Sequence, residues 1–389
     1  MDLLLYWAQS AFQNPTLDSG MNTQSLEGMM SSTYGEILKL SIFGQSHGPA
    51  IGLSLDGIPA GMPVDLDKLQ QFLNRRAPGN GSYATPRKEA DNPEFLSGII
   101  DNYTCGSPIS AVIRNTNTRS GDYENLRNCP RPGHADYPAQ MKHRGFQDVS
   151  GGGHFSGRLT APLCIAGGLC KQWLEKKNIY IGAHIFSIGS IKDEPDTVNT
   201  LNPDLSVFQS DFPVINPSAA AKMQEAIAKV KTDGDSIGGT IECVIKGIPA
   251  GLGDPMFDGI ENKLAQIIYG IPAVKGLEFG SGFAGCAMHG SENTDSYIYE
   301  EGRVKTTTNN CGGILGGITT GMPIIFKVGI KPTPSITKQQ QTINLDTLQS
   351  EALFVHGRHD PCIVPRAVPV VEAAAAIAIF DICLKDGYI

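Results

Sequence analysis

The stretch GPAIGLSLDGIPAG, residues 48–61, decides the fold because a second version of it occurs later in the chain. The second version is GGTIECVIKGIPAG, residues 238–251, and the two align without a gap. Each begins with a short aliphatic run, which favours a β-strand with one buried face, and ends in the turn sequence GIPAG. The repeat therefore predicts two copies of one structural unit.

Each copy runs into a predicted amphipathic helix, because apolar residues recur there at spacings of three and four. A second repeated pair is SGIIDNYTCGSPISAVI at 97–113 and GGILGGITTGMPIIFKV at 312–328. Between the halves, a third helix is predicted to begin at Pro217, with Asn216 as its N-cap. The apolar positions of the three helices are Leu66, Leu69, Phe72 and Leu73; Phe257, Ile260, Leu264, Ile267 and Ile268; and Met223, Ile227 and Val230.

The period of the repeat is far too long for a solenoid, so the two copies predict one domain with internal pseudo-twofold symmetry. Short apolar runs bounded by Gly and Pro, together with amphipathic helices, indicate an α+β fold. We assign this domain to residues 31–389 and treat residues 1–30 as an extension outside the fold, because they show no sustained period.

The composition argues against several classes of protein. The net charge is −8, so no nucleic-acid partner is expected. Nine cysteines without a C-x-x-C pair favour a reducing, cytoplasmic location, and no set of residues at metal-ligand spacing is found. The apolar run AAAAIAIF at 373–380 is too short to span a membrane, so no membrane contact is expected.

Three loops combine a histidine with a nearby glycine: FGQSHG at 43–48, RPGHAD at 131–136 and GRHDP at 357–361. Glycine lets the backbone approach a ligand closely, and in two of the loops a following aspartate would orient the imidazole ring. A turn histidine bonded to backbone is the plainer interpretation of any single loop. Three such loops favour a shared site for proton transfer.

Cationic side chains accompany these loops in an otherwise acidic chain, which predicts a ligand with several phosphate or carboxylate groups. The segments SGGGHFSGRLTA at 150–161 and NNCGGILGGITTG at 309–321 are candidate phosphate cradles, although an ordinary glycine turn explains the second equally well. The cations are Arg75, Arg76, Arg87, Arg114, Arg119, Arg127, Arg131, Lys331, Arg358 and Arg366.

Several motifs stand together in the order found in chorismate synthases, and the chain resembles that family over about residues 33–384. The motifs are FGQSHG, RRAPGNGSYATPRKEAD, RPGHADY, GGILGGITTGMPI, KPTPSIT and GRHDPCIVPRAVPVVEA. The resemblance implies a single β-α-β sandwich domain with internal pseudo-symmetry, which agrees with the repeat, and a homotetramer.

The resemblance also implies a carbon–oxygen lyase. Members of this family convert 5-enolpyruvylshikimate 3-phosphate to chorismate by 1,4-anti elimination of phosphate, in the last common step of aromatic amino acid biosynthesis. Reduced FMN is the implied cofactor, and it offsets the positive character that the ring gains when the allylic C–O bond breaks. Whether NADPH reduces the flavin on this chain or an outside reductase does so is left open by the sequence.

Roles carry over from the family residue by residue. His47 resembles the histidine that protonates the departing phosphate, and His134 the histidine that keeps the reduced flavin in its required protonation state. Asp360 resembles the aspartate that works with the flavin N5 to remove the C6 proton. Arg76 matches an arginine at the mouth of the site. The other positions matching flavin-contacting segments are Ser156, Ala273, Gly316, Lys331, Pro332, Thr333, Pro334, Ser335 and Arg358.

The chain departs from the commoner family pattern at several positions. HFSGRLT at 154–160 stands where many members read Arg-Ser-Ser-Ala-Arg-Glu-Thr, so His154 and Phe155 replace an arginine and a serine. Pro272 replaces an asparagine, and Ala77 replaces an arginine. Flavin contacts are therefore expected to differ there, with more of the affinity resting on Lys331 and Arg358.

Two other functions fit parts of the sequence. A non-catalytic FMN- or phosphate-binding module would use the glycine cradles and the arginines, but it would have no use for two loop histidines and Asp360. A flavin oxidoreductase would consume one reduced flavin per product, whereas an elimination leaves the flavin reduced at the end.

Overall fold

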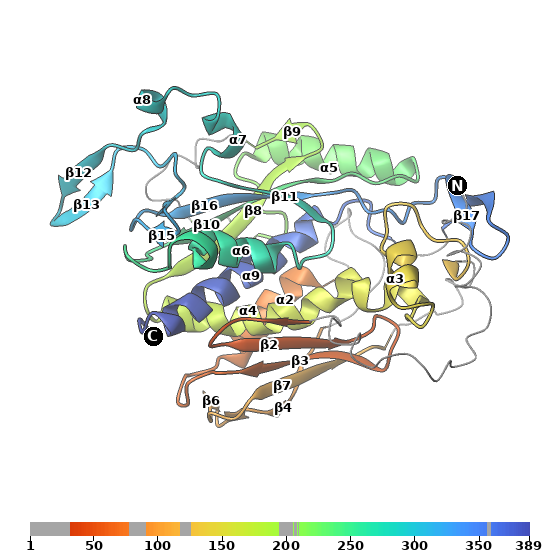
Figure 1. Cartoon of the computed structure of the whole chain (residues 1–389), viewed down its shortest axis with the longest axis horizontal. Coiled ribbons are helices and arrows are strands. Elements are labelled where there is room, and N and C mark those ends of the chain that lie inside the picture. Colours follow the sequence, from red (N-terminus) through yellow and green to blue (C-terminus); the bar gives the residue numbers. More distant parts are fainter. Residues whose placement is uncertain are drawn as a thin grey trace, which may run out of the picture.

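The structure is a computed structural model that describes residues 32–77, 91–116, 126–193, 205, 208, 210–355 and 359–389. The extension predicted at residues 1–30 lies outside the described residues. Helices and strands carry the labels of Figure 1.

Two antiparallel five-stranded sheets form the outer layers of the described chain, and helices fill the layer between them (Figure 1). The first sheet has the order β1 (Thr33–Tyr34), β2 (Lys39–Gly44), β3 (Ala50–Asp56), β7 (Ile109–Arg114) and β4 (Glu94–Ser97). The second has the order β11 (Val274–Phe279), β16 (Ile324–Ile330), β10 (Gly239–Lys246), β8 (Tyr180–Ile188) and β9 (Ile191–Lys192). The middle layer contains α2 (Leu66–Arg76), α4 (Thr160–Glu175), α6 (Ile260–Ile268) and α9 (Val364–Lys385). This β-α-β sandwich confirms the predicted α+β fold.

The remaining elements lie outside these three layers. The helix α5 (Pro217–Thr232) covers part of the outer face of the second sheet (Figure 1). The other elements are β5 (Ile99–Ile100), β6 (Tyr103–Thr104), β12 (Tyr297–Glu300), β13 (Arg303–Thr306), β14 (Ile314–Leu315), β15 (Ile318–Thr319), β17 (Gln340–Asn344), β18 (Gln349–Leu353), α3 (Asp136–Lys142), α7 (Gly282–Gly285), α8 (Gly290–Asn293), and the 3₁₀ turns η3 (Ser150–Phe155), η4 (Gly157–Leu159) and η7 (Met256–Asp258).

The duplication is visible in matching hydrogen bonds. Thr104 Oγ1 donates to the carbonyl of Pro59 at 2.6 Å and accepts from the amide of Met62 at 2.9 Å. The equivalent hydroxyl, that of Thr319, donates to the carbonyl of Pro249 at 2.6 Å and accepts from the amide of Leu252 at 2.9 Å. In both halves the β5–β6 or β14–β15 hairpin is thereby fixed to the GIPAG turn. The repeated sequence thus forms the same local structure twice.

One continuous hydrophobic core joins both sheets to the helical layer. Its central helices pack closely because α4 has glycine at the contact points. A Cβ on Gly167 would lie 2.3 Å from the Cβ of Ala373 on α9, and a Cβ on Gly168 would lie 2.5 Å from Leu69 Cδ1 on α2. Atoms in protein interiors do not approach so closely, so larger residues would force the helices apart.

The helix α9 corrects the expectation drawn from residues 373–380. The apolar segment extends well beyond that run, since α9 has 22 residues and is long and apolar enough to cross a membrane by length and composition alone. Its most apolar window is 94% buried inside the protein, where it forms the centre of the core. The acidic Glu372 is accommodated within α9 because Arg75 and Lys171 pair with it.

The helix between the halves is confirmed, and one helix prediction is wrong in part. The Asn216 side chain caps α5 by accepting from the Ser218 amide, and α5 buries Met223 and Ile227, with Val230 half-buried. Phe257, however, is 80% exposed and lies in the separate turn η7, because α6 begins only after Gly259.

Candidate active site

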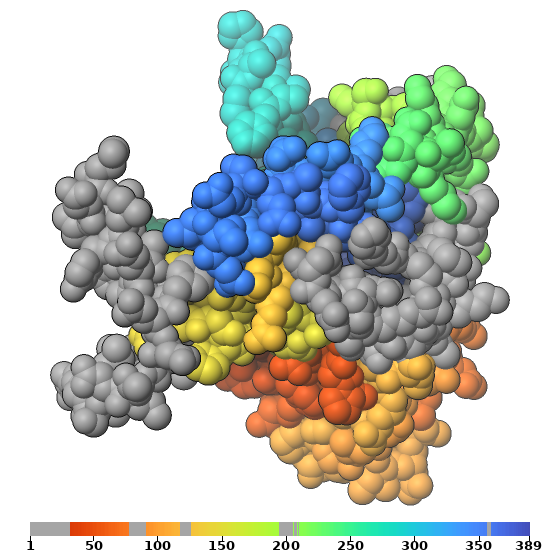
Figure 2. Space-filling model, turned by 90° about the vertical axis from the view of Figure 1, so that its right-hand side faces the viewer, coloured from red at the N-terminus to blue at the C-terminus, as the bar shows by residue number. Residues whose placement is uncertain are grey.

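A cavity of about 1150 Å³ lies where equivalent connections of the two halves meet. One connection, residues 115–159, leads from β7 to α4, and the other, residues 331–363, leads from β16 to α9. They are joined directly, for example by the amide of Leu345, which donates to the carbonyl of Asn128 at 2.8 Å. Figure 2 views this side, where the blue connection lies directly above the gold and yellow one. The pseudo-symmetry of the fold therefore brings two distant stretches of sequence to one cavity.

Most of the predicted site residues line this cavity. They are His47, His134, Asp360, Arg76, Ser156, Ala273, Lys331, Thr333, Pro334 and Ser335. Pro332 is absent from the lining, although its neighbours on both sides belong to it. Gly316 is also absent, because the β14–β15 turn packs against the start of α6, where the Ile260 amide donates to Gly317 at 2.9 Å. Arg358 lies outside the described residues.

His47 lies in the short connection between β2 and β3 and is held from two sides. The Oγ of the buried Ser46 lies 3.2 Å from the Nδ1 of His47. On the other side, Gly151 has a φ of +62°, and a Cβ there would lie 2.0 Å from the His47 Cε1. At the next position a Cβ on Gly152 would lie 3.1 Å from the Cε1 of His134. The glycine loop predicted to cradle a phosphate therefore packs against both imidazole rings.

His134 belongs to a charged cluster that fixes its ring. Its Nδ1 lies 2.5 Å from the Oδ1 of Asp136. The guanidinium of Arg131 donates twice to Asp136, at 2.7 and 2.9 Å, and donates to Ser335 Oγ at 3.0 Å. Burial opposes ionisation of Asp136, but hydrogen bonds from Arg131 and His134 outweigh it and hold the pKa of Asp136 well below its usual range. The guanidinium of Arg131 also lies 3.1 Å from the Nδ1 and 3.4 Å from the Nε2 of His134, so Asp136 and Arg131 together fix the ring.

Asp360 faces the cavity from the segment before α9. Its carboxylate forms an ion pair with Arg366 in the first turns of that helix, and its side chain is 9% exposed. The same guanidinium donates from Nε to the carbonyl of Arg76 at 3.1 Å. The position of Asp360 is therefore coupled to the end of α2.

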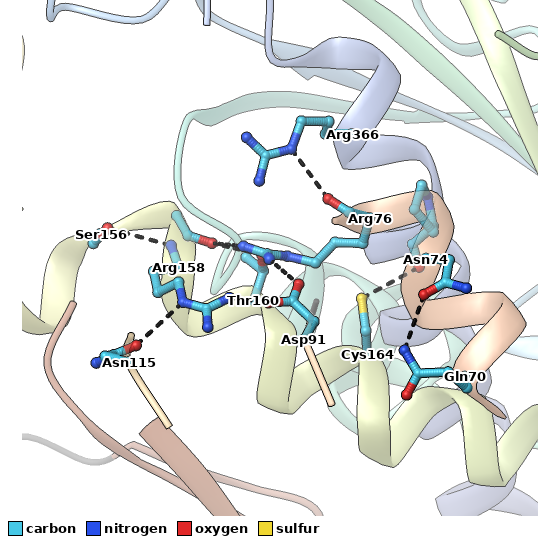
Figure 3. A network of polar contacts seen from close by, with 12 residues as sticks. Gln70, Asn74, Arg76, Asp91, Asn115, Ser156, Arg158, Thr160, Cys164 and Arg366 are labelled. Carbon is cyan, nitrogen blue, oxygen red and sulfur yellow. Dashed lines mark hydrogen bonds and ion pairs between the residues drawn. The ribbon is translucent and has the colours of Figure 1, made fainter. Parts of the chain in front are cut away.

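Arg76 lies deeper than the mouth position expected for it, since its side chain is only 3% exposed. It donates to Asp91 at 2.5 Å, to Thr160 at 3.1 Å and to the Gly157 carbonyl at 3.0 Å (Figure 3). Arg158 pairs with the other oxygen of Asp91. Burial opposes ionisation of Asp91, but the two guanidiniums outweigh it and lower the pKa of that carboxyl. The floor of the cavity is thus a buried cluster of two cations and one anion.

A second cationic patch, Lys331 and Lys275, also lines the cavity. The Nζ of Lys331 donates to the Gly133 carbonyl, which joins the two connections. Burial and the nearby charge of Lys275 lower the pKa of Lys331, so the two ammonium groups are close enough to repel. An anion bound between them would relieve that repulsion.

His154, one of the residues that distinguish this chain from the common family pattern, has protein contacts of its own. Both ring nitrogens of His154 have such partners, with Nδ1 2.8 Å from the Gly44 carbonyl and Nε2 2.8 Å from the Ser32 Oγ. His154 therefore does not offer a ligand the fork of donors that an arginine would.

Sequence reasoning also included cations that do not serve the site, and it missed charged residues that do. Arg75 pairs with Glu372 in the core, and Arg114 pairs with Glu94 on the surface. The lining residue Lys275 and the buried Asp91 were not singled out. The final aspartate of RRAPGNGSYATPRKEAD was the one available signal for Asp91.

The residues of the cavity fit a flavin together with a second ligand. Pockets for one drug-sized ligand are typically about 300–1,000 Å³, and this cavity is larger than that range. A flavin ring requires apolar walls, and its phosphate requires cations. The cavity offers both, with Leu163, Ile271, Ile363, Val370 and Phe155 on its walls beside Arg131, Lys275 and Lys331.

Comparisons with known proteins agree on one family. The model of the chorismate synthase family matches residues 38–384. The chorismate synthase of Lancefieldella parvula is 45% identical over 366 residues, which cover 91% of this chain and 96% of that protein. That of Dehalococcoides mccartyi is 43% identical over 360 residues, which cover 92% and 98%. A crystal structure of a chorismate synthase superimposes with a TM-score of 0.70 at 28% identity, covering 91% of this chain and 93% of the other. The chain therefore belongs to the chorismate synthase family, and as a member it is a lyase of aromatic amino acid biosynthesis.

Proposed function

We propose that the chain converts 5-enolpyruvylshikimate 3-phosphate to chorismate by 1,4-anti elimination of phosphate, with reduced FMN as its cofactor. The observation that carries this proposal is that His47, His134 and Asp360 line one cavity together with several cations. Two proton-transfer steps and two anionic ligands require such a combination.

Two residues of the cavity lining serve the two bonds that break. His47 protonates the departing phosphate, and contacts with Ser46 and Gly151 hold its ring in place. Asp360 works with the flavin N5 to remove the proton from C6, and its ion pair with Arg366 orients the carboxylate. A fixed acid and a fixed base replace diffusional encounters with solvent, which lowers the barrier to each transfer.

The flavin would be held by Ala273, Lys331, Thr333, Pro334 and Ser335, which line the wall beside His134. When bound there, reduced FMN supplies electron density to the substrate ring while the allylic C–O bond breaks. His134 holds or delivers a proton on this side, and its contact with Asp136 fixes the orientation of its ring. NADPH is the candidate reductant of the flavin, either on this chain or through an outside reductase.

We also propose a cytoplasmic homotetramer that contacts neither membrane nor nucleic acid. The β12–β13 arm projects from the body (Figure 1) and exposes Tyr297, Tyr299 and Val304. Exposed apolar patches of this kind mark protein interfaces. Light scattering on the purified protein tests the assembly, and a monomeric mass at micromolar concentration would contradict it.

The reaction is tested anaerobically with purified protein, substrate and photoreduced FMN, by following phosphate release and the flavin spectrum. We expect many phosphates per flavin, with the flavin still reduced at the end. A second run with NADPH in place of photoreduction tests whether the chain reduces its own flavin. One flavin oxidised per product would indicate an oxidoreductase, and FMN binding without phosphate release would indicate a binding module.

A further inference from the structure

A chain of hydrogen bonds connects Asp360 with the loop that carries His47. It begins at Arg366, which pairs with Asp360 and donates to the main-chain carbonyl of Arg76. The Arg76 side chain then donates to one oxygen of Asp91, and Arg158 pairs with the other oxygen. Figure 3 shows Asp91 between the two guanidiniums, with Arg366 above.

The chain continues from Arg158 to the loop that carries His47. Arg158 Nε donates to the Oδ1 of Asn115 at 3.3 Å. The side-chain amide of Asn115 donates in turn to the carbonyls of Gln45 at 3.0 Å and Gly48 at 2.8 Å. These two carbonyls flank His47, so the proposed acid and the proposed base are connected through one buried carboxylate.

Asp91 occupies this position in spite of complete burial and an unfavourable backbone conformation. Its side chain is 0% exposed, and its φ of +44° lies in the left-handed region, which costs most residues free energy but which Asp and Asn tolerate better. Asp91 places one carboxylate against both guanidiniums, those of Arg76 and Arg158. Without that carboxylate the two cations would repel and turn toward any anion in the cavity.

We propose that Asp91 is a positioning residue, which holds Arg76 and Arg158 at a fixed separation and thereby sets the distance between His47 and Asp360. The roles of His47 and Asp360 in this statement rest on the proposed function. The other part of the proposal, that Asp91 keeps the two arginines from turning toward bound anions, does not depend on the proposed function.

The test compares D91N with wild type, because Asn keeps the size of the side chain and tolerates the backbone angle. We expect kcat to fall by about 10- to 100-fold with a much smaller change in KM, since small misplacements of reacting groups cost this much. Titration calorimetry with inorganic phosphate should show tighter binding to D91N, by about threefold or more, because two guanidiniums lose their carboxylate. The matched control is E94Q, which removes an exposed carboxylate paired with Arg114 and should change neither quantity.

A fall in kcat together with tighter phosphate binding distinguishes a positioning role from general damage to the fold. A purely structural role would weaken turnover and phosphate binding together with the melting temperature, and that result would overturn the proposal, as would an unchanged kcat. If wild type releases no phosphate from the substrate, the proposed function fails, and the phosphate titration still decides whether Asp91 restrains the arginines.

A second variant covers the case in which D91N does not fold. N115A cuts the link between Arg158 and the His47 loop at a half-buried position. We expect kcat to fall by about tenfold with phosphate affinity unchanged, because Asp91 still restrains both arginines. An unchanged kcat in N115A would overturn the proposed connection between Asp360 and His47.

Discussion

The two halves of the molecule share their strands but differ on the outer faces of their sheets. In the first half, Gly52 of β3 lies opposite Phe43 of β2, and Phe43 is 45% exposed. At the aligned position of the second half, Glu242 of β10 lies opposite His184 of β8, and His184 is 1% exposed. An open apolar pair in one half is thus a buried charged pair in the other.

The connections between these strands explain the difference. Residues 45–49 join β2 to β3 directly and carry His47. Residues 189–238 join β8 to β10 and include β9 and α5, together with Phe208, which stacks on His184 at 5.3 Å. The repeated strands therefore form the same rigid frame in both halves. The connection between them is short and carries a candidate catalytic histidine in the first half, whereas in the second half it is long and covers the outer face of the sheet.

The largest expected effect tests whether both halves contribute to one site. We expect H134A and D360N each to lower kcat/KM by about 10²–10⁴-fold, because each removes a proton-transfer group, while FMN still binds. The double variant should be far less impaired than the product of the two single losses, since the groups act as a unit. Anaerobic phosphate release and FMN fluorescence titration measure the two quantities. Wild-type turnover in either single variant would show that the half carrying that residue takes no part in the reaction.

The glycine loop gives the next largest effect. G151A should lower kcat by about 100-fold, because the new Cβ would lie 2.0 Å from His47 and must displace the ring. The control is G302A in the β12–β13 turn, where φ is +77° and no atom lies within 4 Å of the new Cβ. Both variants carry backbone strain, so comparable turnover in steady-state assays of the two would show that the His47 contact is irrelevant.

The equivalence of the halves predicts matched losses of stability. T104V and T319V each remove a buried hydroxyl that joins a hairpin to a GIPAG turn, and each leaves an amide and a carbonyl without that partner. We expect each to lower the free energy of unfolding by about 1–3 kcal/mol in urea denaturation. A large loss in one variant and none in the other would show that the repeated geometry is not equally important.

The smallest expected effect concerns the buried charged pair found only in the second half. Burial opposes protonation of His184, but Asp193 and Glu242 outweigh it and raise the pKa of His184 above its ordinary value of about 6.5. Its contribution to stability is therefore complete below about pH 6.5 and is lost as the pH rises through the raised value. Thermal melts of wild type and H184Q between about pH 6 and 9 should show the stability difference shrinking with increasing pH. A difference independent of pH would contradict a charged His184.

Local signals in the sequence were sufficient for much of the fold. The strand repeats, the cap of α5 and the three histidine loops are encoded by neighbouring residues, so periodicity and turn chemistry revealed them. Phe257 was misplaced because its spacing matches the apolar positions of α6, although that helix begins only after Gly259 and so does not contain Phe257. Asp91 escaped notice because its partners Arg76 and Arg158 lie 15 and 67 residues away.

By itself, the sequence determined that the chain is a duplicated α+β protein with histidine, aspartate and arginine in glycine-rich loops. Only the tertiary structure decided which of these residues meet. It brought the connection after β7 against the connection after β16, buried Arg76 on Asp91, and left Gly316 on the α6 side of the fold. The physical reason is that strands and helices follow from interactions between near neighbours, whereas a cavity depends on packing between segments far apart in the chain.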